Sequence, residues 1–477
     1  MSKNFYITTT LPYTNSDPHV GFAAEIIKAD VIARIERSLG KEVIFNTGTD
    51  EHGLKIFQKA EAAGLDPRTF CNPYAAKFHS LKELLNLSFT NFIRTSDEHH
   101  IKAAQEFWRR CEANGDIYKK TYQVKYCVGC EMEKTDSELV NDHCPLHPSQ
   151  NLELINEENY FFRFSKYQDA LLKLYQDQSD FVVPSNRLNE IRNFVAGGLQ
   201  DFSISRLASK MPNGVPVPGD ETQVMYVWFD ALANYISTLG WPENEDNFKN
   251  FWPGVQVCGK DNLRQQSAMW QAMLTSAGLP FSEQVLVFGF LTANGQKISK
   301  SSGNTVDPFE LVEKFGTDAV RYYLLTEIPM FEDGDFSEER LAQKYNADLA
   351  NGLGNLVARV SNMLEKNNIV TKLDSEKAAE KAKEFFTDYR ADNYRFGASL
   401  QKIWQMIAVD NEKLSAAAPW KLSDQKEIAD ILQPIAENIL FIAHLLQPFL
   451  PTSAEKIITQ FKEPQIVKGE ALFPRLS

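Results

Sequence analysis

The amino-terminal half of the chain alternates between short apolar runs and longer segments of helical periodicity. The run FYITTT (5–10) predicts a short strand, the amphipathic segment 23–40 predicts a helix that ends at Gly40, and the run 41–50 predicts a second strand. Further apolar runs, each beside a helical pattern, lie at 89–96, 255–260 and 284–291. Strands separated by helices assemble into a mostly parallel sheet, so the pattern predicts an α/β domain.

This alternation is interrupted twice. Residues 118–224 combine a cysteine cluster with the turn-rich stretch 208–222, which indicates an insertion between the two halves of one sheet. From Ser337 onward the pattern is helical only, with an apolar stripe at Leu341, Tyr345, Leu349, Leu353, Leu356, Val360 and Met363. The sequence therefore predicts four segments: the first half of the sheet domain (1–117), the insertion (118–224), the second half of the sheet domain (225–336) and an all-α bundle (337–477).

Composition narrows the class of protein. A chain of 477 residues with 43% hydrophobic content is long enough for about three domains. The net charge of −13 argues against a generally basic nucleic-acid coat, but it leaves room for a local basic groove. The N-terminus has no long apolar segment, and the apolar run 439–450 is too short to span a bilayer. We therefore expect a cytoplasmic protein with no membrane partner.

Three of the six cysteines lie close together and are accompanied by a histidine. Cys127-x2-Cys130 is followed, after thirteen residues, by Cys144-x2-His147. Two short loops with this spacing predict a closed, tetrahedral Cys3His zinc site with a structural role. His143 is a rival ligand, and the alternative is that the three thiols are reduced and free of metal. The small number of cysteines does not suggest a disulfide scaffold.

Two stretches carry residues suited to phosphate. His19 and Gly21 lie where the first strand is followed by a helix, and a glycine at a helix N-terminus lets a phosphate approach the backbone N–H groups. Lys297 and Lys300, in NGQKISKSSGN (294–304), are two ammonium groups on a loop that could close over a polyphosphate. The alternatives are a histidine that only caps the helix and a solvated surface loop.

Taken together, these stretches resemble a known family. HVGF (19–22) and KISKS (297–301) are similar to the two signatures of class I aminoacyl-tRNA synthetases. The blocks at 8–22, 47–53, 226–235 and 259–266 resemble, within that class, the methionyl-tRNA synthetases. All blocks occur in the family's order over nearly the whole chain, so the resemblance is far more specific than a single short motif.

The resemblance implies a Rossmann-type sheet domain and a two-step reaction. Such enzymes activate methionine with ATP and Mg²⁺ to methionyl-adenylate, release pyrophosphate, and transfer methionine to the terminal adenosine of its tRNA, including the initiator. The nucleophile belongs to the substrate, so the protein acts by positioning and electrostatic stabilisation. His19, Lys297 and Lys300 are the implied catalytic residues, and the other implied ATP contacts are Gly21, Phe22, Gly259, Asp261 and Ser299.

The same resemblance implies the amino-acid and tRNA sites. Asp50 is expected to receive the ammonium group of methionine; the alternative is an aspartate in a surface turn. The implied methionine slot is lined by Leu11, Tyr13, Trp228, Ala231, Leu232, Tyr235 and Gln266, although its aromatic residues could equally be core residues. The implied readers of the anticodon are Asn355, Arg359 and Trp420, which could otherwise form an ordinary solvated face.

Two residues depart from the family pattern. Phe22 stands where the first signature usually ends in histidine and cannot donate a hydrogen bond to ATP. Gln266 stands where many members have a histidine in the methionine pocket. These departures motivate one alternative, a catalytically silent tRNA-binding paralogue. Cysteinyl-tRNA synthetase is a second alternative, while the insertion is too short for the editing domain of the isoleucine, valine and leucine enzymes. We expect a monomer.

Overall fold

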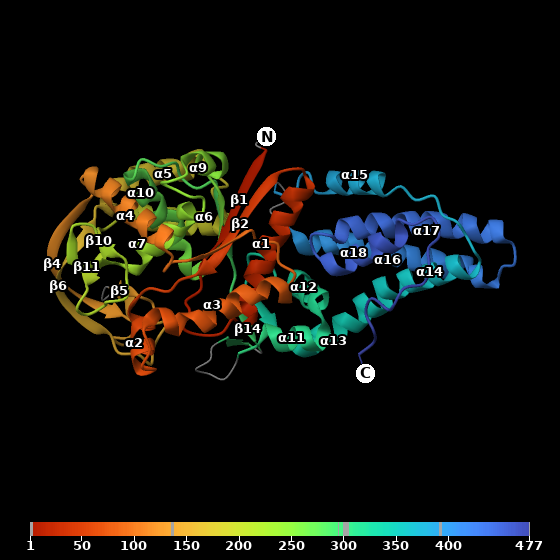
Figure 1. Cartoon of the computed structure of the whole chain (residues 1–477), viewed down its shortest axis with the longest axis horizontal. Helices are drawn as coiled ribbons and strands as arrows, with labels where there is room; N and C mark the ends of the chain where they lie inside the picture. Colours follow the sequence, from red (N-terminus) through yellow and green to blue (C-terminus); the bar gives the residue numbers. More distant parts are fainter. Residues whose placement is uncertain (1–2, 135–137, 294, 299–304, 391–393, 477) are drawn as a thin grey trace.

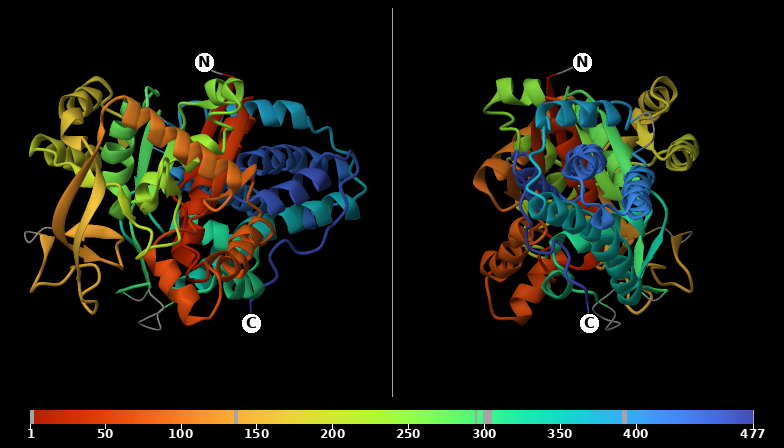
Figure 2. Two further views of the ribbon diagram at one scale, coloured as in Figure 1. Left: turned by 60° about the vertical axis from the view of Figure 1, so that its left-hand side comes forward. Right: turned by 90° about the vertical axis from the view of Figure 1, so that its right-hand side faces the viewer.

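The computed structural model of the chain describes residues 3–134, 138–293, 295–298, 305–390 and 394–476. The molecule is elongated (Figure 1): long antiparallel strands of the insertion lie at one end, the C-terminal helices at the other, and the central sheet between them. Figure 2 shows from two further sides that the C-terminal helices form one bundle. The predicted α/β sheet with an insertion and a following helical bundle is confirmed.

The central sheet has six strands, all parallel, in the order β3-β2-β1-β12-β13-β7. β1 lies between β2 and β12, with Ile7 opposite both Phe45 and Val255. The strand order changes direction between β1 and β12, and in such sheets ligands bind outside the carboxyl ends of the strands at this point. The strands are β1 (Asn4–Thr9), β2 (Glu42–Thr49), β3 (Asn91–Arg94), β7 (Val182–Val183), β12 (Val255–Gly259) and β13 (Gln284–Phe288).

Helices cover both faces of this sheet, because the residues of β1 point alternately to two separate cores. Phe5 and Ile7 join the core that contains α1, whereas Tyr6 joins the core that contains α4 and α10. Each large apolar side chain buried in this way contributes about 1.5–3 kcal/mol. The helices of the sheet domain are α1 (Val20–Ser38), α2 (Leu54–Ala62), α3 (Pro67–Leu84), α4 (Glu98–Ala113), α7 (Val227–Leu232), α8 (Asn234–Ser237), α9 (Glu245–Phe251), α10 (Trp270–Ser276), α11 (Pro308–Phe315) and α12 (Thr317–Thr326).

The described strands of the predicted insertion, apart from β7, form antiparallel sheets of their own. One contains β5, β4, β6 and β8, and another contains β10, β11 and β9. β7 also lies within residues 118–224, but it pairs with β13 and forms one edge of the central sheet. The boundaries 117, 224 and 336 stay predictions. The insertion's elements are β4 (Ile117–Cys127), β5 (Met132–Lys134), β6 (Glu153–Phe162), α5 (Gln168–Asp177), α6 (Ser185–Ala196), β8 (Phe202–Ser203), β9 (Ser205–Leu207), β10 (Pro216–Val217) and β11 (Asp220–Met225).

The C-terminal bundle begins with a continuous helical segment whose middle part is a π-helix, η6 (Tyr345–Gly354), between α13 (Glu338–Lys344) and α14 (Asn355–Lys366). The predicted apolar stripe is buried along this segment. The remaining elements are α15 (Ser375–Phe385), α16 (Phe396–Ala417), η7 (Pro419–Lys421), α17 (Gln425–Leu446) and α18 (Pro451–Phe461). Among the described residues, α17 alone is long and apolar enough to cross a membrane, and half of its apolar window is buried inside the bundle, as expected of a core helix.

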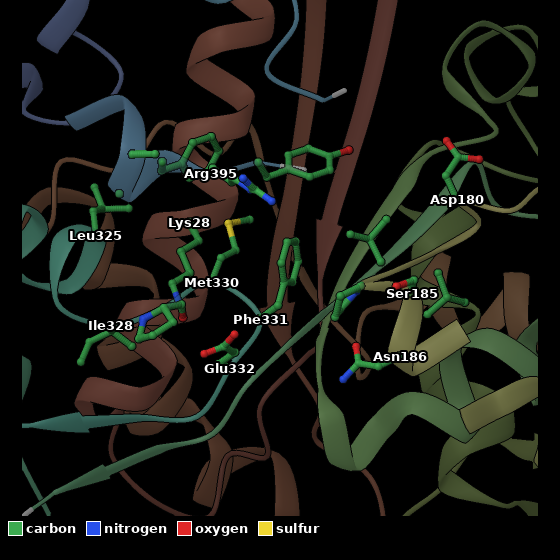
Figure 3. A pocket seen from close by; sticks show the side chains of 18 of the residues that line it. Lys28, Asp180, Ser185, Asn186, Leu325, Ile328, Met330, Phe331, Glu332 and Arg395 are labelled. Carbon is green, nitrogen blue, oxygen red and sulfur yellow. The ribbon is translucent and has the colours of Figure 1, made fainter. Parts of the chain in front are cut away.

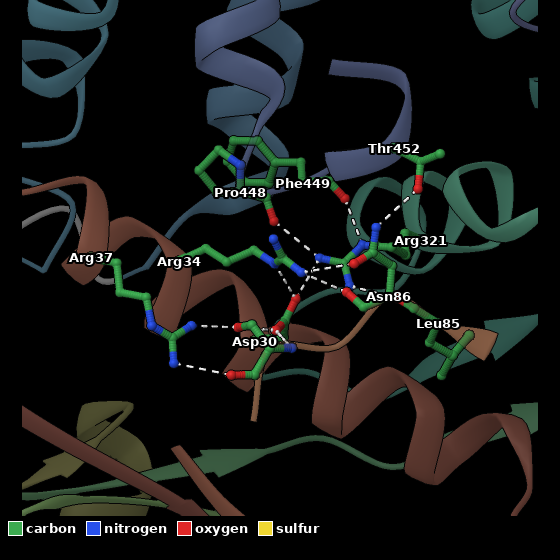
Figure 4. A network of polar contacts seen from close by, with 10 residues as sticks. Asp30, Arg34, Arg37, Leu85, Asn86, Arg321, Pro448, Phe449 and Thr452 are labelled. Carbon is green, nitrogen blue, oxygen red and sulfur yellow. Dashed lines mark hydrogen bonds and ion pairs between the residues drawn. The ribbon is translucent and has the colours of Figure 1, made fainter. Parts of the chain in front are cut away.

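A buried arginine of the sheet domain, Arg321, forms an ion pair within that domain and hydrogen bonds to the bundle (Figure 4). The Nη2 atom of Arg321 on α12 lies 2.8 Å from Oδ2 of Asp30 on α1, and both side chains are 0% exposed. Arg321 also donates hydrogen bonds to the carbonyl oxygens of Leu85, Pro448 and Phe449. Burial alone would raise the pKa of Asp30, but the guanidinium groups of Arg321 and Arg34 hold that pKa below its ordinary value. The pair therefore fixes α1 against the start of α18.

Candidate active site and metal cluster

The first turn of α1 is organised around His19. This residue is the N-cap of α1, and its Nδ1 atom accepts a hydrogen bond from Gly21 N at 3.1 Å. Nδ1 is therefore unprotonated in the neutral ring, and the hydrogen is on Nε2. A Cβ atom on Gly21 would lie only 2.9 Å from Cε1 of His19, so the glycine is needed for the imidazole to fold over the helix start. His19 thus caps the helix through Nδ1, and Nε2 carries the ring hydrogen.

Phe22 packs against the protein. Its ring meets Phe78 of α3 edge to face, with centroids 5.1 Å apart. An aromatic pair of this geometry stabilises the contact between α1 and α3. Phe22 therefore serves as an apolar packing residue in the first turn of α1.

The carboxyl end of β12 faces α1 across the break in strand order. A Cβ on Gly259 would lie 2.8 Å from Oδ1 of the exposed Asp261, so the Asp261 carboxylate folds over the glycine. Glu25, on the turn of α1 after Gly21, lies within electrostatic reach of Asp261. Burial, together with the charge of Asp261, raises the pKa of Glu25 to about 8. Two carboxyl groups therefore lie near the start of α1.

The second predicted signature lies on a small three-stranded sheet. β15 (Gln296–Lys297) pairs with β14 (Leu291–Ala293), which in turn pairs with β16 (Gly334–Phe336). Lys297 stands opposite Thr292 in this sheet. Ser299 and Lys300 lie outside the described residues.

Asp50 lies directly after β2, at the carboxyl edge of the central sheet. A bridge between Asp50 and Tyr13 extends the pairing of β1 and β2 beyond the ends of the strands. The Asp50 carboxylate accepts hydrogen bonds from His52 N and from Thr95 Oγ1, each at 3.3 Å. Burial raises the pKa of Asp50 well above its usual range, and the nearby carboxylate of Asp230 raises it further. Asp50 is therefore a buried acid and not a residue of a surface turn.

Behind Asp50, one buried carboxylate binds two imidazoles. Oδ2 of Asp230 lies 3.1 Å from Nδ1 of His52, and its Oδ1 lies 3.5 Å from Nε2 of His100. Burial would lower the pKa of His52, but the negative charge of Asp230 raises it above the ordinary value. Burial lowers the pKa of His100. The charge of Asp230 thus favours the protonated form of His52, whereas burial favours the neutral form of His100.

The residues predicted to form the methionine slot come from three parts of the chain and differ in burial. Leu11, Ala231, Leu232, Tyr235 and Gln266 are buried, while Tyr13 and Trp228 are half-buried. Nε2 of Gln266 donates a hydrogen bond of 2.5 Å to the hydroxyl oxygen of Tyr235. The indole N–H of Trp228 has no hydrogen-bond partner among the described residues. The predicted set therefore combines apolar side chains with two phenols, those of Tyr13 and Tyr235, and Tyr13 is bridged to Asp50.

The cysteine cluster forms with the predicted histidine. The sulfur atoms of Cys127, Cys130 and Cys144 and Nδ1 of His147 all lie within 4.8 Å of one another. Cys130 Sγ lies 3.4 Å from Cys144 Sγ and 3.2 Å from His147 Nδ1. Tetrahedral zinc with bonds of about 2.0–2.3 Å requires ligand atoms separated by about 3.5–3.8 Å, so the four residues fit this ion. His143, the rival ligand, instead contacts Asn141 O.

Glu131, the residue after Cys130, connects this cluster to the predicted active site. Its carboxylate accepts hydrogen bonds from Lys55 N, in the first turn of α2, and from the hydroxyl of Tyr126. Its backbone oxygen accepts one from the hydroxyl of Tyr226, the N-cap of α7. Glu131 is fully buried and has a φ of 52°, a conformation unusual for a residue with a side chain. The metal loop therefore packs against the starts of both α2 and α7.

The residues predicted to read an anticodon share one surface of the bundle. Asn355 is exposed at the start of α14, and Arg359 lies one turn further on. The guanidinium carbon of Arg359 lies 5.0 Å from the ring centroid of Trp420, which is 52% exposed. An exposed indole with a cation over one face is a suitable platform for an unstacked base.

One cavity is lined by none of the predicted site residues (Figure 3). It has a volume of about 750 Å³ and is bounded by β7, the segment 328–332 and the first turn of α16. Lys28 and Arg395 line it together with Asp180 and Glu332, so charges of both signs face the space. None of the predicted site residues contributes to it, and we do not assign it to the reaction.

Several residues of the site were not predicted. Glu25 and Asp230 lie inside quoted family blocks or next to them, but their neighbours come from distant parts of the chain. One sequence feature could have identified Glu131 as a residue of the site: it directly follows a predicted metal ligand. The buried imidazole of His100 follows His99 in an ordinary helical pattern, and nothing there pointed to the site.

Comparisons with known proteins agree with this geometry. The family model described as "tRNA synthetases class I (M)" matches residues 5–153 and 137–361. A methionine–tRNA ligase of Thermotoga maritima is 43% identical over 471 residues, which cover 95% of this chain and 74% of that protein. One from Synechocystis is 42% identical over 481 residues, covering 96% of this chain and 89% of that protein.

Solved structures are similar over the full length. Mycobacterium tuberculosis methionyl-tRNA synthetase in complex with methionyl-adenylate matches with a TM-score of 0.92 and 36% identity, covering 100% of both chains. The ligand-free form of the same synthetase matches with a TM-score of 0.84 and 34% identity, covering 100% of this chain and 99% of that one.

Proposed function

Because the chain belongs to the methionine–tRNA ligases of the class I tRNA synthetase family, we propose that the residues gathered at the carboxyl edge of its central sheet bind methionine and ATP. The reaction is the ligation of methionine to tRNA. A carboxylate oxygen of methionine attacks the α-phosphorus of ATP, and the bond to the pyrophosphate oxygen breaks. A hydroxyl of the terminal tRNA ribose then attacks the carbonyl carbon, and AMP leaves.

Methionine is placed by Asp50. Its carboxylate is buried beside the predicted slot, and a buried carboxylate attracts an ammonium group far more strongly than an exposed one does. Tyr13, Leu11 and the α7 residues Trp228, Ala231 and Leu232 enclose the side chain, with Tyr235 and Gln266 at its end. The burial of Asp50 at the end of β2 is the single observation that best supports this assignment.

The nucleotide lies at the start of α1. His19 donates from Nε2 to the phosphates, and the N-terminal end of α1 adds a positive dipole. Gly21 and Phe22 border the nucleotide, and Gly259 and Asp261 contact its ribose. Lys297, Ser299 and Lys300 close over the phosphates, where Mg²⁺ accompanies ATP. These groups stabilise the charge of the departing pyrophosphate without forming a covalent intermediate.

The Cys3His cluster binds one structural zinc ion, because all four positions are filled by protein. Through Glu131 it holds the starts of α2 and α7 next to Asp50 and Trp228. Asn355, Arg359 and Trp420 read the anticodon of the methionine tRNAs, the initiator included. A monomer in the cytoplasm remains our prediction.

The test is methionine-dependent exchange of pyrophosphate into ATP on the purified protein. Cysteine, isoleucine, leucine and valine serve as competing substrates, and Lys300→Ala is the variant. We expect exchange with methionine alone, reduced at least a hundredfold in the variant. Exchange with cysteine would favour the cysteinyl enzyme, and binding of tRNA without any exchange would favour a silent paralogue.

A further inference from the structure

Behind Tyr235 lies a buried chain of polar side chains, three glutamines and a serine. Gln256 is on β12, Gln266 is in η4 (Gln265–Met269), Gln271 is on α10, and Ser282 precedes β13. The three glutamines are 0% exposed and Ser282 is 3% exposed. Amides so far from water need partners, and their contacts with one another satisfy them. This row of polar side chains ends at the Tyr235 hydroxyl, in the proposed methionine slot.

Two backbone groups fix the direction of the first amide. Ser282 N donates to Oε1 of Gln271 at 3.0 Å, and Nε2 of Gln271 donates to the backbone oxygen of Gln266 at 2.8 Å. A backbone N–H can only donate and a carbonyl oxygen can only accept. The amide of Gln271 therefore has one possible orientation.

That orientation determines all the others. Nε2 of Gln271 also lies 3.0 Å from Oγ of Ser282 and 3.4 Å from Oε1 of Gln256. Because two NH2 groups repel each other, Gln256 must present its oxygen here, and this oxygen accepts from the Ser282 hydroxyl at 2.5 Å. Nε2 of Gln256 then faces Oε1 of Gln266 at 3.1 Å, and Nε2 of Gln266 faces the Tyr235 hydroxyl oxygen at 2.5 Å. Each amide thus transmits the same polarity to the next.

The Tyr235 oxygen consequently accepts a hydrogen bond from the protein, and its own hydrogen makes none to any described residue. Resting on the assignment of the methionine site above, we propose that Gln271, Ser282, Gln256 and Gln266 form a relay that turns the Tyr235 hydroxyl hydrogen toward the thioether sulfur of methionine. Gln256, Gln271 and Ser282 are positioning residues, since they act only through Gln266 and Tyr235.

The relay provides a means of discriminating methionine from norleucine. A thioether sulfur accepts a hydrogen bond, whereas the methylene group of norleucine, which occupies the same place in a chain of similar shape, does not. If Gln266 instead presented its oxygen to Tyr235, the hydroxyl would donate its hydrogen to Gln266. Neither methionine nor norleucine would then receive a hydrogen bond from Tyr235. The polarity of the buried chain therefore decides whether sulfur is recognised.

The test compares kcat/KM for methionine with that for norleucine in ATP–pyrophosphate exchange. Tyr235→Phe should lower the ratio about fivefold, the value expected for one neutral hydrogen bond. Gln256→Met should lower this ratio nearly as much. The change should come from a higher KM for methionine, and KM for ATP should be unchanged. Gln284→Met is the matched control, because Gln284 is a buried glutamine of β13 that bonds to Asp180 O, outside the relay. It should keep the parent ratio.

The ratio is measured on active molecules, so a smaller folded fraction cancels. Ser282→Ala, which removes one oxygen, gives a second reading and should shift the ratio in the same direction. The relay would be overturned if Tyr235→Phe lowered the methionine-to-norleucine ratio of kcat/KM while Gln256→Met and Ser282→Ala both kept the parent ratio. A ratio unchanged in Tyr235→Phe itself would instead overturn the placing of the methionine side chain against Tyr235.

Discussion

At the scale of single residues, we expect a change at the contact between His19 and Gly21 to lower the rate of catalysis and leave the stability of the fold nearly unchanged. In Gly21→Ala the new Cβ would lie 2.9 Å from Cε1 of His19. An imidazole at the end of a side chain can move away at little cost, so we expect the melting temperature to stay within a few degrees. His19 would then no longer be aimed at the phosphates, and kcat for pyrophosphate exchange should fall about a hundredfold.

The matched control is Gly397→Ala on α16, where the new Cβ would have only an ordinary contact at 3.6 Å. Its exchange rate should equal that of the parent. Normal exchange in Gly21→Ala would show that His19 needs no fixed orientation.

Asp50 predicts a dependence of methionine binding on pH. Because burial raises the pKa of Asp50, the carboxyl takes up a proton at higher pH than an exposed aspartate does. Protonation removes the charge that attracts the substrate ammonium, so KM for methionine should rise as the pH falls through this raised pKa. Calorimetry in buffers of different ionisation enthalpy should detect release of a proton when methionine binds.

The same raised pKa gives Asp50→Asn a distinctive signature. At any pH above the ordinary pKa of an aspartate, the raised pKa of Asp50 destabilises the ligand-free fold relative to the unfolded chain, and the effect is complete once the pH exceeds the raised pKa. The variant should therefore melt at a higher temperature than the parent at neutral pH, while methionine-dependent exchange is lost. A variant that loses exchange and also melts earlier would contradict this interpretation.

Residues with their own chemistry could be predicted from the sequence, and their partners could not. The motif around Asp50 indicated a carboxylate for an ammonium group. Its pKa, however, depends on Asp230, far away in the chain, and no local pattern joins the two. The orientation of Gln266 likewise depends on Ser282, on another element.

At the scale of elements, the ion pair between α1 and α12 should be costly to break. Arg321→Met leaves the buried Asp30 without one of its two cations and leaves three carbonyl oxygens without a donor. Removing one partner of a buried pair costs about 3–5 kcal/mol, so the free energy of unfolding in urea should fall by that amount. Lys249→Met removes an exposed pair with Glu245 and should change it by less than about 1 kcal/mol. Equal effects of the two variants would refute the argument.

Elements with a long periodic pattern were predictable, and short or irregular ones were not. α1 and the strands β1, β2, β12 and β13 follow the sequence pattern closely. β7 has only two residues, too few to show any period, and its place beside β13 depends on tertiary pairing. The π-helical turns of η6 carry the same apolar stripe as an α-helix would, so sequence periodicity could not identify them.

At the scale of the whole molecule, the proposed sites for the chemistry and for tRNA reading lie in separate parts of the structure. Trp420→Ala should raise KM for tRNA in aminoacylation tenfold to a hundredfold, as expected for about 1–3 kcal/mol of base stacking. Pyrophosphate exchange, which needs no tRNA, should be unchanged. Val409→Ala removes another exposed apolar side chain of the bundle and should alter neither reaction. A loss of exchange in Trp420→Ala would contradict this separation.

The position of β1 between β2 and β12 also has a consequence for biosynthesis. Ile7 pairs with Val255, so the central strand of the sheet acquires its second neighbour only after about 250 further residues have been made. At roughly 5–20 residues per second, a nascent chain carries an open strand edge for roughly 10 to 50 s. The helices of the C-terminal bundle, in contrast, find most of their partners close by in sequence. The yield of folded protein on the ribosome therefore depends on what covers β1 during that interval.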